Sequence, residues 1–291
     1  MPELPEVQTI VTALARRLVG RTIREVLVLK AEMLRKQALT FAGHLNGRRI
    51  KAVERHGKSI FVEFETESER SSRLRIHLGM TGQILFLSPG DPPAKHTHVI
   101  LKFDDPSLAV HYRDIRRFGR LEVIEASSFS PVPDAWRASK EVLYARLRSK
   151  RGMVKHALLN QHVVAGLGNI YVDESLYRSK IHPKQDLADL SSERLHALCL
   201  AIHDVLAESI ELGGTSFRNY VDTAGGRGGF KGRLQVYGKE GSICSCGARI
   251  RKIVAAGRGT HFCPRCQRLR RTTRKRGVLG SPTSARSLTR K

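Results

Sequence analysis

The first apolar residues of the chain recur at intervals of three and four positions. A helix would place all of them on one face: Val7, Ile10, Val11, Leu14 and Leu18. This spacing predicts an amphipathic helix close to the N-terminus. Pro5 suits its first turn, where the missing N–H is not needed, and Gly20 is a typical residue at a helix end.

The apolar pattern changes to a period of two between Thr22 and about Glu125. Residues 59–65 and 98–103 are typical of strands in this part of the chain. Turn-forming residues separate the runs at Gly57, Gly82, Pro89-Gly90 and Asp104-Asp105-Pro106. Many short strands at this spacing predict a β-sandwich or a flattened barrel.

Helical spacing returns after residues 127–134, a segment rich in Ser and Pro that is typical of a linker. The clearest helix ends at Gly213-Gly214 and has an apolar face formed by Leu195, Leu198, Cys199, Ile202, Val205, Leu206 and Ile210. We therefore expect Cys199 to be a core cysteine. A glycine-rich stretch over 225–232 precedes a predicted short strand over 234–237.

Positive charge is the most informative bulk property. The chain has 51 Lys and Arg against 27 Asp and Glu, a net charge of +24. Nucleic acid is the usual partner of such a surface, and a ribosome-associated protein or a basic tail on a neutral enzyme are the alternatives. The segment after Gln267 holds nine basic residues and no acid, which predicts a disordered basic tail. The remaining excess lies in the folded part, including Arg16, Arg17, Arg48, Arg49, Arg116 and Arg117.

The sequence has no apolar run of the length that a membrane helix needs, and its N-terminus lacks a basic-then-apolar signal pattern. We therefore expect no membrane partner and a cytosolic location.

Four of the five cysteines cluster near the C-terminus, at Cys244, Cys246, Cys263 and Cys266. In a cytosolic chain such a cluster predicts one structural zinc ion and not disulfides. The first pair is a C-x-C, which shortens the usual turn. A metal-free hairpin held by packing is the alternative, and His261 is a less favoured substitute ligand.

The second residue is a proline, and removal of Met1 would leave it as a secondary amine. A terminal amine has a pKa of about 7.7–8.0, so a useful fraction is neutral and nucleophilic at physiological pH. Pro2 attacking an aldehyde-level carbon would give an iminium ion, and Glu3 could act as its acid or base. The alternative is a frayed terminus whose prolines only begin a helix.

Several segments in register resemble the bacterial formamidopyrimidine-DNA glycosylases. The N-terminal signature is Met1-Pro2-Glu3-Leu4-Pro5-Glu6-Val7, and Arg55-His56-Gly57-Lys58 resembles the loop with the family's catalytic lysine. Residues 78–82 and 114–119 are similar to its two intercalating loops, 164–174 to its helix-two-turns-helix, and 258–267 to its zinc-finger hairpin. Together these segments cover nearly the whole chain to Gln267.

The resemblance implies a bifunctional glycosylase and lyase. Pro2 would attack C1′ of the damaged nucleotide and expel the base, Glu3 would protonate the sugar ring oxygen, and Lys58 would contact phosphates near the lesion. Successive β- and δ-elimination would then cut the strand without a redox cofactor or catalytic metal. Arg258, which belongs with this catalytic set, would grip the phosphates that flank the lesion.

The resemblance also implies a DNA-binding set. Met80, Arg116 and Phe118 would fill the hole that the extruded base leaves, and their glycine-flanked contexts favour exposure over core packing. Arg117 is expected to contact phosphate. Further DNA contacts are expected from His96, Lys155 and Asn169, the last in the Gly166-Leu167-Gly168-Asn169 turn.

The expected substrate is an oxidised purine, 8-oxoguanine or a formamidopyrimidine, paired with cytosine. The Leu4-Pro5 form of the N-terminus and the long segment over 213–230 favour this branch over the Nei-type endonucleases, which prefer oxidised pyrimidines. Residues lining the base pocket would be Thr215, Ser216, Arg218 and Tyr220. A non-catalytic nucleic-acid module is a third reading, but it leaves Pro2, Glu3 and Lys58 unexplained.

We therefore predict an α+β fold with DNA in the cleft between two domains. An N-terminal catalytic β-sandwich flanked by helices would span 1–130, a helix-two-turns-helix domain 131–235, a β-hairpin zinc finger 236–267 and a basic tail 268–291. The protein would act as a monomer on double-stranded DNA, in the cytoplasm with the nucleoid.

Overall fold

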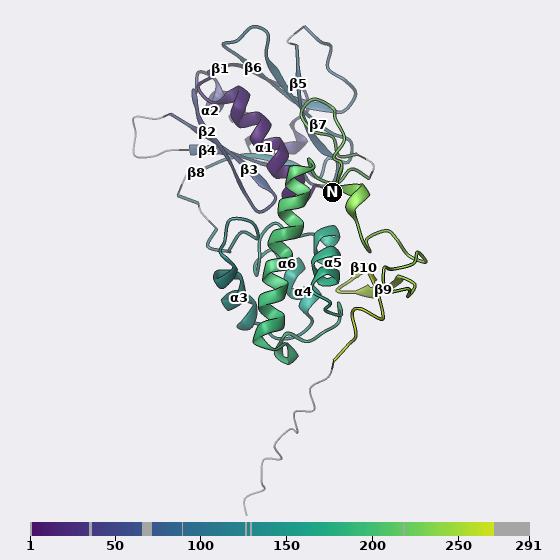
Figure 1. The fold of residues 1–291 in the computed structure, drawn as a ribbon. Helices are drawn as coiled ribbons and strands as arrows, with labels where there is room; N and C mark the ends of the chain where they lie inside the picture. The colour runs from purple at the N-terminus through teal and green to yellow at the C-terminus, as the bar shows by residue number, and fades with distance from the viewer. Residues whose placement is uncertain are drawn as a thin grey trace, which may run out of the picture.

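The chain folds into a strand-rich lobe, a helical lobe and a small hairpin beside the second lobe (Figure 1). The computed structural model describes residues 2–34, 37–65, 72–88, 90–125, 127–128, 130–217 and 219–270. Within these residues, no helix is long and apolar enough to span a membrane. The architecture confirms the predicted α+β class.

The strand-rich lobe consists of two four-stranded antiparallel sheets. One has the order β1-β6-β7-β5 and comprises β1 (Ile23–Val28), β6 (Thr97–Phe103), β7 (Ala109–Asp114) and β5 (Gly82–Leu87). The other has the order β2-β3-β4-β8 and comprises β2 (Ile50–His56), β3 (Ser59–Phe64), β4 (Ser72–His77) and β8 (Arg120–Glu125). Buried and partly exposed residues alternate along β3, as the period of two predicted.

Helix α1 (Leu4–Leu18) joins the two lobes. It packs against β2 and against the long helix α6 (Ser192–Glu211), and the lobe also contains the short helices η1 (Ala31–Met33) and α2 (Phe41–Leu45). All five apolar residues that predicted this helix are buried. Val7 belongs to the core of the strand-rich lobe, whereas Leu4, one turn earlier, belongs to the core of the helical lobe. The start of α1 therefore lies at the junction of the two cores.

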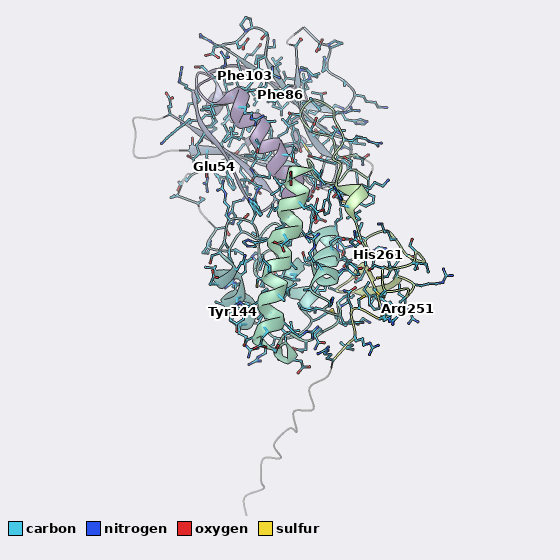
Figure 2. The ribbon with its side chains drawn as sticks, in the orientation of Figure 1. Glu54, Phe86, Phe103, Tyr144, Arg251 and His261 are labelled. Carbon is cyan, nitrogen blue, oxygen red and sulfur yellow. The ribbon has the colours of Figure 1, made fainter. Side chains whose placement is uncertain are left out.

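The helical lobe is built around α6, whose predicted apolar face is buried except at Ile210, which is partly buried. Cys199 is a core residue, as predicted. The other helices are α3 (Lys140–Arg148), α4 (Val154–Leu159), α5 (Asn169–Arg178), η3 (Leu187–Asp189) and η4 (Phe230–Arg233). Figure 2 places Phe86 and Phe103 in the strand-rich lobe, Tyr144 in the helical lobe, and Arg251 and His261 on the hairpin.

The hairpin, β9 (Arg251–Ala255) and β10 (Arg258–Phe262), is docked on one side of α5. Asn169 Nδ2 donates to the Gly259 carbonyl at 2.8 Å, and the His261 amide donates to Asp173 Oδ2 at 2.8 Å. One turn further along, the Tyr177 hydroxyl lies 3.3 Å from Cys244 Sγ. Three successive turns of α5 therefore hold the hairpin and the cysteine cluster.

The strand predicted over 234–237 is wrong: these residues form no strand in the structure. The amides of Gln235, Val236 and Tyr237 all donate to the carboxylate of Glu174 on α5, at 2.8–2.9 Å. The Glu174 carboxylate therefore accepts the backbone hydrogen bonds that a neighbouring strand would accept in a sheet. The apolar pattern agrees with the burial of Leu234 and Val236, but it gave the wrong hydrogen-bond partner.

The predicted linker contains an interlobe anchor. Asp134 is buried and binds the guanidinium of Arg55 through two hydrogen bonds, at 2.5 and 2.9 Å. It also accepts the amides of Gly57, at 2.7 Å, and of Trp136 and Arg137. The ion pair and three amide bonds fix the β2–β3 turn to the start of the helical lobe.

The domain boundaries given above remain predictions, and so does the disordered tail beyond Arg270, because residues 271–291 lie outside the described residues. Residues 268–270 are described, and Arg270 forms two backbone hydrogen bonds with the side chain of Gln185.

Candidate functional site

The first residues of α1 meet the N-terminus of α5 where the two lobes join. Pro2 and Glu3 are both buried there. The Leu4 amide donates to the Gly166 carbonyl at 3.2 Å, and Glu3 Oε1 accepts the Ile170 amide at 3.2 Å. Since free amides at a helix N-terminus attract negative charge, the predicted turn before Asn169 positions the Glu3 carboxylate.

The second carboxylate oxygen of Glu3 is poised for chemistry. Within the described part of the chain, no group donates a hydrogen bond to Glu3 Oε2, although this atom is buried. Burial raises the pKa of Glu3, and the positive charge of Lys58 and the amides of Ile170 and Tyr171 only partly oppose this rise. A carboxyl group with a raised pKa and a free oxygen can give a proton to a bound substrate.

Lys58 lies in the tight turn between β2 and β3. Gly57 adopts a φ of +58°, a left-handed conformation that glycine allows at little cost, and its amide is held by Asp134. Burial lowers the pKa of Lys58, while the negative charges of Glu3 and Glu6 act in the opposite direction. The predicted residues Pro2, Glu3 and Lys58 are therefore brought to one place, as the resemblance implied.

Glu6 is a member of this site that the sequence analysis did not single out. Its carboxylate accepts the amides of Glu3 and Thr215, both at 2.7 Å, and the hydroxyl of Tyr171. Burial and the charge of Glu3 raise the pKa of Glu6 to about 7. One signal in the sequence could have found it: Glu6 precedes Ile10 and Leu14 by one and two turns, so it shares the buried face of α1.

Tyr171 extends this network to α6. Its hydroxyl also lies 2.7 Å from Ser209 Oγ and 2.9 Å from Thr215 Oγ1. The network links the start of α1, the first turn of α5, the end of α6 and Thr215 in the loop that follows α6.

Met80, Arg116 and Phe118 gather at one exposed edge of the strand-rich lobe. Met80 is 39% exposed and Phe118 is 52% exposed. The Arg116 guanidinium stacks 4.6 Å from the centre of the Phe118 ring, and its Nη1 lies 3.2 Å from Met80 Sδ. Large exposed apolar side chains beside a cation suit insertion into a base stack.

The two loops that carry these side chains touch each other. A Cβ on Gly79 would lie 2.6 Å from the Phe118 carbonyl carbon, so only glycine allows this approach. Asp114 accepts the Thr81 hydroxyl at 2.5 Å and the amides of Arg116 and Gly119. The contact fixes both loops relative to β7.

Arg117 and His96 lie close to these loops and both have positive φ, 57° and 69°. The exposed Arg117 pairs with Glu32 at 3.2 Å, and the His96 carbonyl accepts the Asp114 amide at 3.1 Å. The structure therefore places both residues beside the candidate DNA-facing edge.

Lys155 does not lie where we expected it. Its side chain is fully buried, and its ammonium binds Asp173 Oδ1 at 2.5 Å. The other oxygen of Asp173 holds the His261 amide, so the lysine neutralises a carboxylate that anchors the hairpin. Asn169 is likewise engaged with Gly259 through its amide nitrogen, while its buried Oδ1 has no hydrogen-bond partner among the described residues.

The candidate base-pocket side chains hold the glycine-rich loop together. Thr215 contacts Glu6 and Tyr171, Ser216 Oγ donates to the Tyr220 carbonyl at 2.9 Å, and Tyr220 donates to the Gly213 carbonyl at 3.0 Å. All three are buried, so their hydroxyls support the loop conformation. Arg218 lies outside the described residues.

Arg258 is exposed at the turn of the hairpin. Its positive charge contributes to lowering the pKa of both Lys58 and Lys155. The hairpin therefore extends Arg258 toward the same site as the β2–β3 turn.

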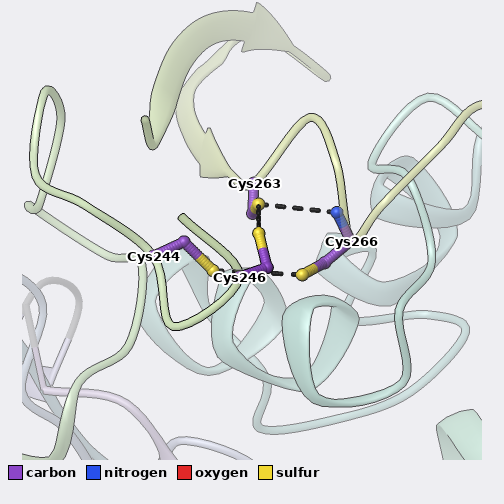
Figure 3. Close-up of side chains that lie close together, drawn as sticks. All are labelled: Cys244, Cys246, Cys263 and Cys266. Carbon is purple, nitrogen blue, oxygen red and sulfur yellow. Dashed lines mark hydrogen bonds between the residues drawn. The ribbon is translucent and has the colours of Figure 1, made fainter. Parts of the chain in front are cut away.

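The four clustered cysteines fit one metal ion. Figure 3 shows their side chains converging, and all four Sγ atoms lie within 4.8 Å of one another. Cys246 and Cys263 are 3.4 Å apart and Cys244 and Cys266 are 3.9 Å apart, close to the roughly 3.8 Å expected between thiolates on tetrahedral zinc. The short C-x-C spacing is thus compatible with a zinc site.

Three family models match the chain in order. The formamidopyrimidine-DNA glycosylase N-terminal domain matches residues 1–121, its H2TH domain matches 129–221, and the zinc finger found in FPG and IleRS matches 245–269. The three matches follow the strand-rich lobe, the helical lobe and the hairpin.

Individual relatives match over nearly their full length. The formamidopyrimidine-DNA glycosylases of Geobacillus kaustophilus and Carboxydothermus hydrogenoformans are 40% and 38% identical, with 92% of this chain and 100% of each relative covered. A Lactococcus lactis FPG variant bound to DNA containing Fapy-dG has a TM-score of 0.83 at 37% identity, and covers 92% of this chain. The wild-type Lactococcus enzyme bound to DNA with an oxidised pyrimidine gives 0.82 at 36% identity, with the same coverage.

Proposed function

Since this chain belongs to the formamidopyrimidine-DNA glycosylase family, we propose that it excises oxidised purines from double-stranded DNA and then cuts the strand. One observation carries the proposal: Pro2 and Glu3 are held against the N-terminus of α5, within the electrostatic reach of Lys58. This assembly suits a reaction in which an amine attacks a sugar carbon and a neighbouring acid opens the ring.

The reaction begins at the proline nitrogen. Removal of Met1 makes Pro2 a secondary amine, whose lone pair attacks C1′ of the extruded nucleotide. The bond from C1′ to the base breaks, and the base leaves with that electron pair and takes up a proton. Opening of the ring then converts the C1′–N bond into an iminium ion, an electron sink for the later steps.

Glu3 supplies the proton for ring opening. Its raised pKa keeps a protonated fraction available, and the free Oε2 can donate to the sugar ring oxygen, O4′. The Lys58 ammonium lies within electrostatic reach of this carboxyl and can bind the phosphate next to the damaged nucleotide.

The iminium ion drives strand cleavage. Loss of a proton from C2′ sends electrons toward the iminium, and the 3′ phosphate leaves in the β-elimination. A second elimination along the conjugated chain releases the 5′ phosphate. Water then hydrolyses the conjugated imine, which releases the sugar remnant as an unsaturated aldehyde and regenerates the free amine of Pro2. The product is a gap with phosphate at both ends.

DNA binding would place the lesion between the two lobes. Met80, Arg116 and Phe118 enter the stack in place of the extruded base, while Arg117 and His96 lie beside the backbone. Arg258 and the turn before Asn169 bind phosphates from the other side. One zinc ion on the four cysteines keeps the Arg258 hairpin folded.

A second substrate class has one specific observation in its favour: the Lactococcus enzyme was solved with DNA containing an oxidised pyrimidine. Parallel cleavage assays on otherwise identical duplexes separate the candidates. We expect fastest cleavage of 8-oxoguanine and formamidopyrimidine duplexes, opposite cytosine. Faster cleavage of the thymine glycol duplex would show that oxidised pyrimidines are the preferred substrates. Binding of abasic DNA without any cleavage would show that the protein is a non-catalytic nucleic-acid-binding module.

We further propose that the enzyme acts as a monomer in the cytoplasm, associated with the nucleoid. The net charge of +24 supports association with DNA, and it predicts an affinity that falls steeply with salt.

A further inference from the structure

A basic cavity lies at the end of the helical lobe that is remote from Pro2. Five side chains of like charge line it: Lys180, Arg194, Arg265, Arg268 and Arg270, with Ser179 and Cys266 completing the wall. Its volume is about 510 Å³. No carboxylate is among these described lining residues, so five positive charges face one space.

The fold holds this basic cavity in shape. Arg194 Nη2 donates to the Lys180 carbonyl at 2.9 Å, and Arg265 Nη1 donates to the Cys246 carbonyl at 2.7 Å. The side chain of the buried Gln185 binds both the amide and the carbonyl of Arg270, at 3.0 and 2.7 Å. Contacts within the fold therefore place the guanidinium groups of Arg194 and Arg265 and the backbone of Arg270.

Placing these cations close together costs electrostatic free energy, and a bound anion would offset it. Burial and the charge of Arg270 lower the pKa of Arg194, so these two arginines repel each other. Guanidinium groups match phosphate oxygens in pairs, and they keep their charge at any physiological pH. A ligand with several consecutive phosphate groups therefore fits these arginine and lysine side chains best.

The basic cavity is separate from the lesion site. Glu3 contacts the first turn of α5, whereas Ser179 and Lys180 follow its last turn, and ten residues of helix span about 15 Å. Arg258 lies at the turn of the hairpin, but Arg265 lies beyond its other end, in the zinc knuckle. Figure 1 shows the described chain leaving the helical lobe at the end opposite the N-terminus.

We propose that the basic cavity binds the sugar-phosphate backbone of a second DNA segment while the cleft between the lobes holds the first. The identity of the polyanion rests on the proposed function, since an enzyme bound to DNA meets other DNA segments at high local concentration. The sequence after Arg270 adds further basic residues: Arg271, Arg274, Lys275 and Arg276. Holding two segments lets the enzyme pass from one to the other without dissociating.

A two-duplex capture assay tests the proposal. The full-length enzyme is bound to an immobilised short duplex with an abasic-site analogue, and a labelled undamaged duplex is then added. The test variant combines Arg194→Gln, Arg268→Gln and Arg270→Gln, which leaves the backbone bonds of Gln185 in place. The matched control removes three exposed charges from the strand-rich lobe through Arg16→Gln, Arg24→Gln and Lys51→Gln.

We expect the wild type and the control to capture the second duplex to within about twofold of each other, and the test variant to lose about tenfold in capture. Cleavage of a short 8-oxoguanine duplex by the test variant should be unchanged. Equal capture by the test variant, or no capture by the wild type, would overturn the proposal. A matching loss in single-duplex cleavage would also overturn it, because the cations would then serve the first duplex. Failure of the proposed function is a different result, namely no cleavage by the wild type.

Discussion

Gly168 shows how one residue sets the geometry of the candidate catalytic site. It has extended backbone angles, so its conformation does not require glycine. A Cβ at this position, however, would lie 2.1 Å from Cδ of Glu3. The missing side chain is what lets the Glu3 carboxyl reach the N-terminus of α5.

We therefore predict that Gly168→Ala displaces the Glu3 carboxyl and slows base excision by about 100-fold, since misplacement of a catalytic group by 1 Å is this costly. Single-turnover cleavage of an 8-oxoguanine duplex measures the effect. Gly43→Ala is the matched control, because nothing lies within 4 Å of the added methyl group. Equal rates for the two variants would show that Glu3 does not need this position.

Glu6 predicts a pH dependence of stability. Its folded-state pKa of about 7 exceeds the ordinary 4.5, so the protonated carboxyl is the form that the fold favours. The resulting stabilisation is complete below the ordinary pKa and is lost as the pH rises through about 7. At most it amounts to about 3 kcal/mol.

Glu6→Gln should remove this pH-dependent component. The free energy of unfolding of the wild type should therefore fall relative to that of the variant by about 1 to 3 kcal/mol as the pH rises from mildly acidic to mildly alkaline. Urea unfolding across this range measures it. Glu211→Gln, at an exposed position, should follow the wild type. A constant difference across the range would contradict the assignment.

The sequence singled out Pro2, Glu3 and Lys58 as a group because they stand in short motifs whose order is specific, and the structure places Glu3 within electrostatic reach of Lys58. It did not reveal Glu6 or the true position of Lys155. A charged residue is expected at the surface unless a buried partner is known, and the partners here, Tyr171 and Asp173, are distant along the chain. Such pairings become visible only when the helices are packed.

At the scale of elements, α5 organises the second half of the molecule. Its N-terminus holds Glu3, and its side chains Asn169, Asp173 and Glu174 hold the hairpin and the segment that precedes it. Periodicity predicted α1, α6, β3 and β6, since burial of one face is a local property of the sequence. The segment over 234–237 was predicted wrongly because its hydrogen-bond partner is the side chain of Glu174, which no local pattern specifies.

Replacing Glu174 should test this role. Glu174→Ala would leave three backbone amides, at Gln235, Val236 and Tyr237, without their acceptor, and we expect a loss of about 2 to 5 kcal/mol in the free energy of unfolding. Glu208→Gln is the control, because the Arg178–Glu208 pair is partly exposed and should contribute less than about 1 kcal/mol. Similar losses in both variants would mean that Glu174 does not anchor the segment.

At the scale of the whole molecule, two lobes and a hairpin bring residues from distant parts of the chain to one site. The lobes are joined by the buried Arg55–Asp134 pair and by α1, whose first turn lies in one core and the rest in the other. The overall α+β arrangement could be predicted from the sequence. The interlobe anchor could not, because Asp134 lies in a segment whose composition is that of an exposed linker.

Removal of zinc should separate the hairpin from the rest of the fold. Chelation, or Cys244→Ser, should release the cysteine cluster and the Arg258 turn, and DNA affinity should fall by about tenfold or more because phosphate contacts are lost. Metal content per chain and binding to an abasic-analogue duplex provide the two readouts. Cys199→Ala should keep one zinc ion, since this residue lies outside the cluster. Full affinity without metal would refute a structural role for zinc.

The role of Pro2 as the nucleophile is tested most directly by borohydride reduction during turnover on an 8-oxoguanine duplex, followed by mass spectrometry of the protein–DNA adduct. We predict a covalent bond at the nitrogen of Pro2 in a chain that has lost Met1, and no adduct at Pro2 in chains that retain Met1, because the nitrogen is then an amide without a nucleophilic lone pair. An adduct on Lys58, or full cleavage by chains that retain Met1, would contradict it.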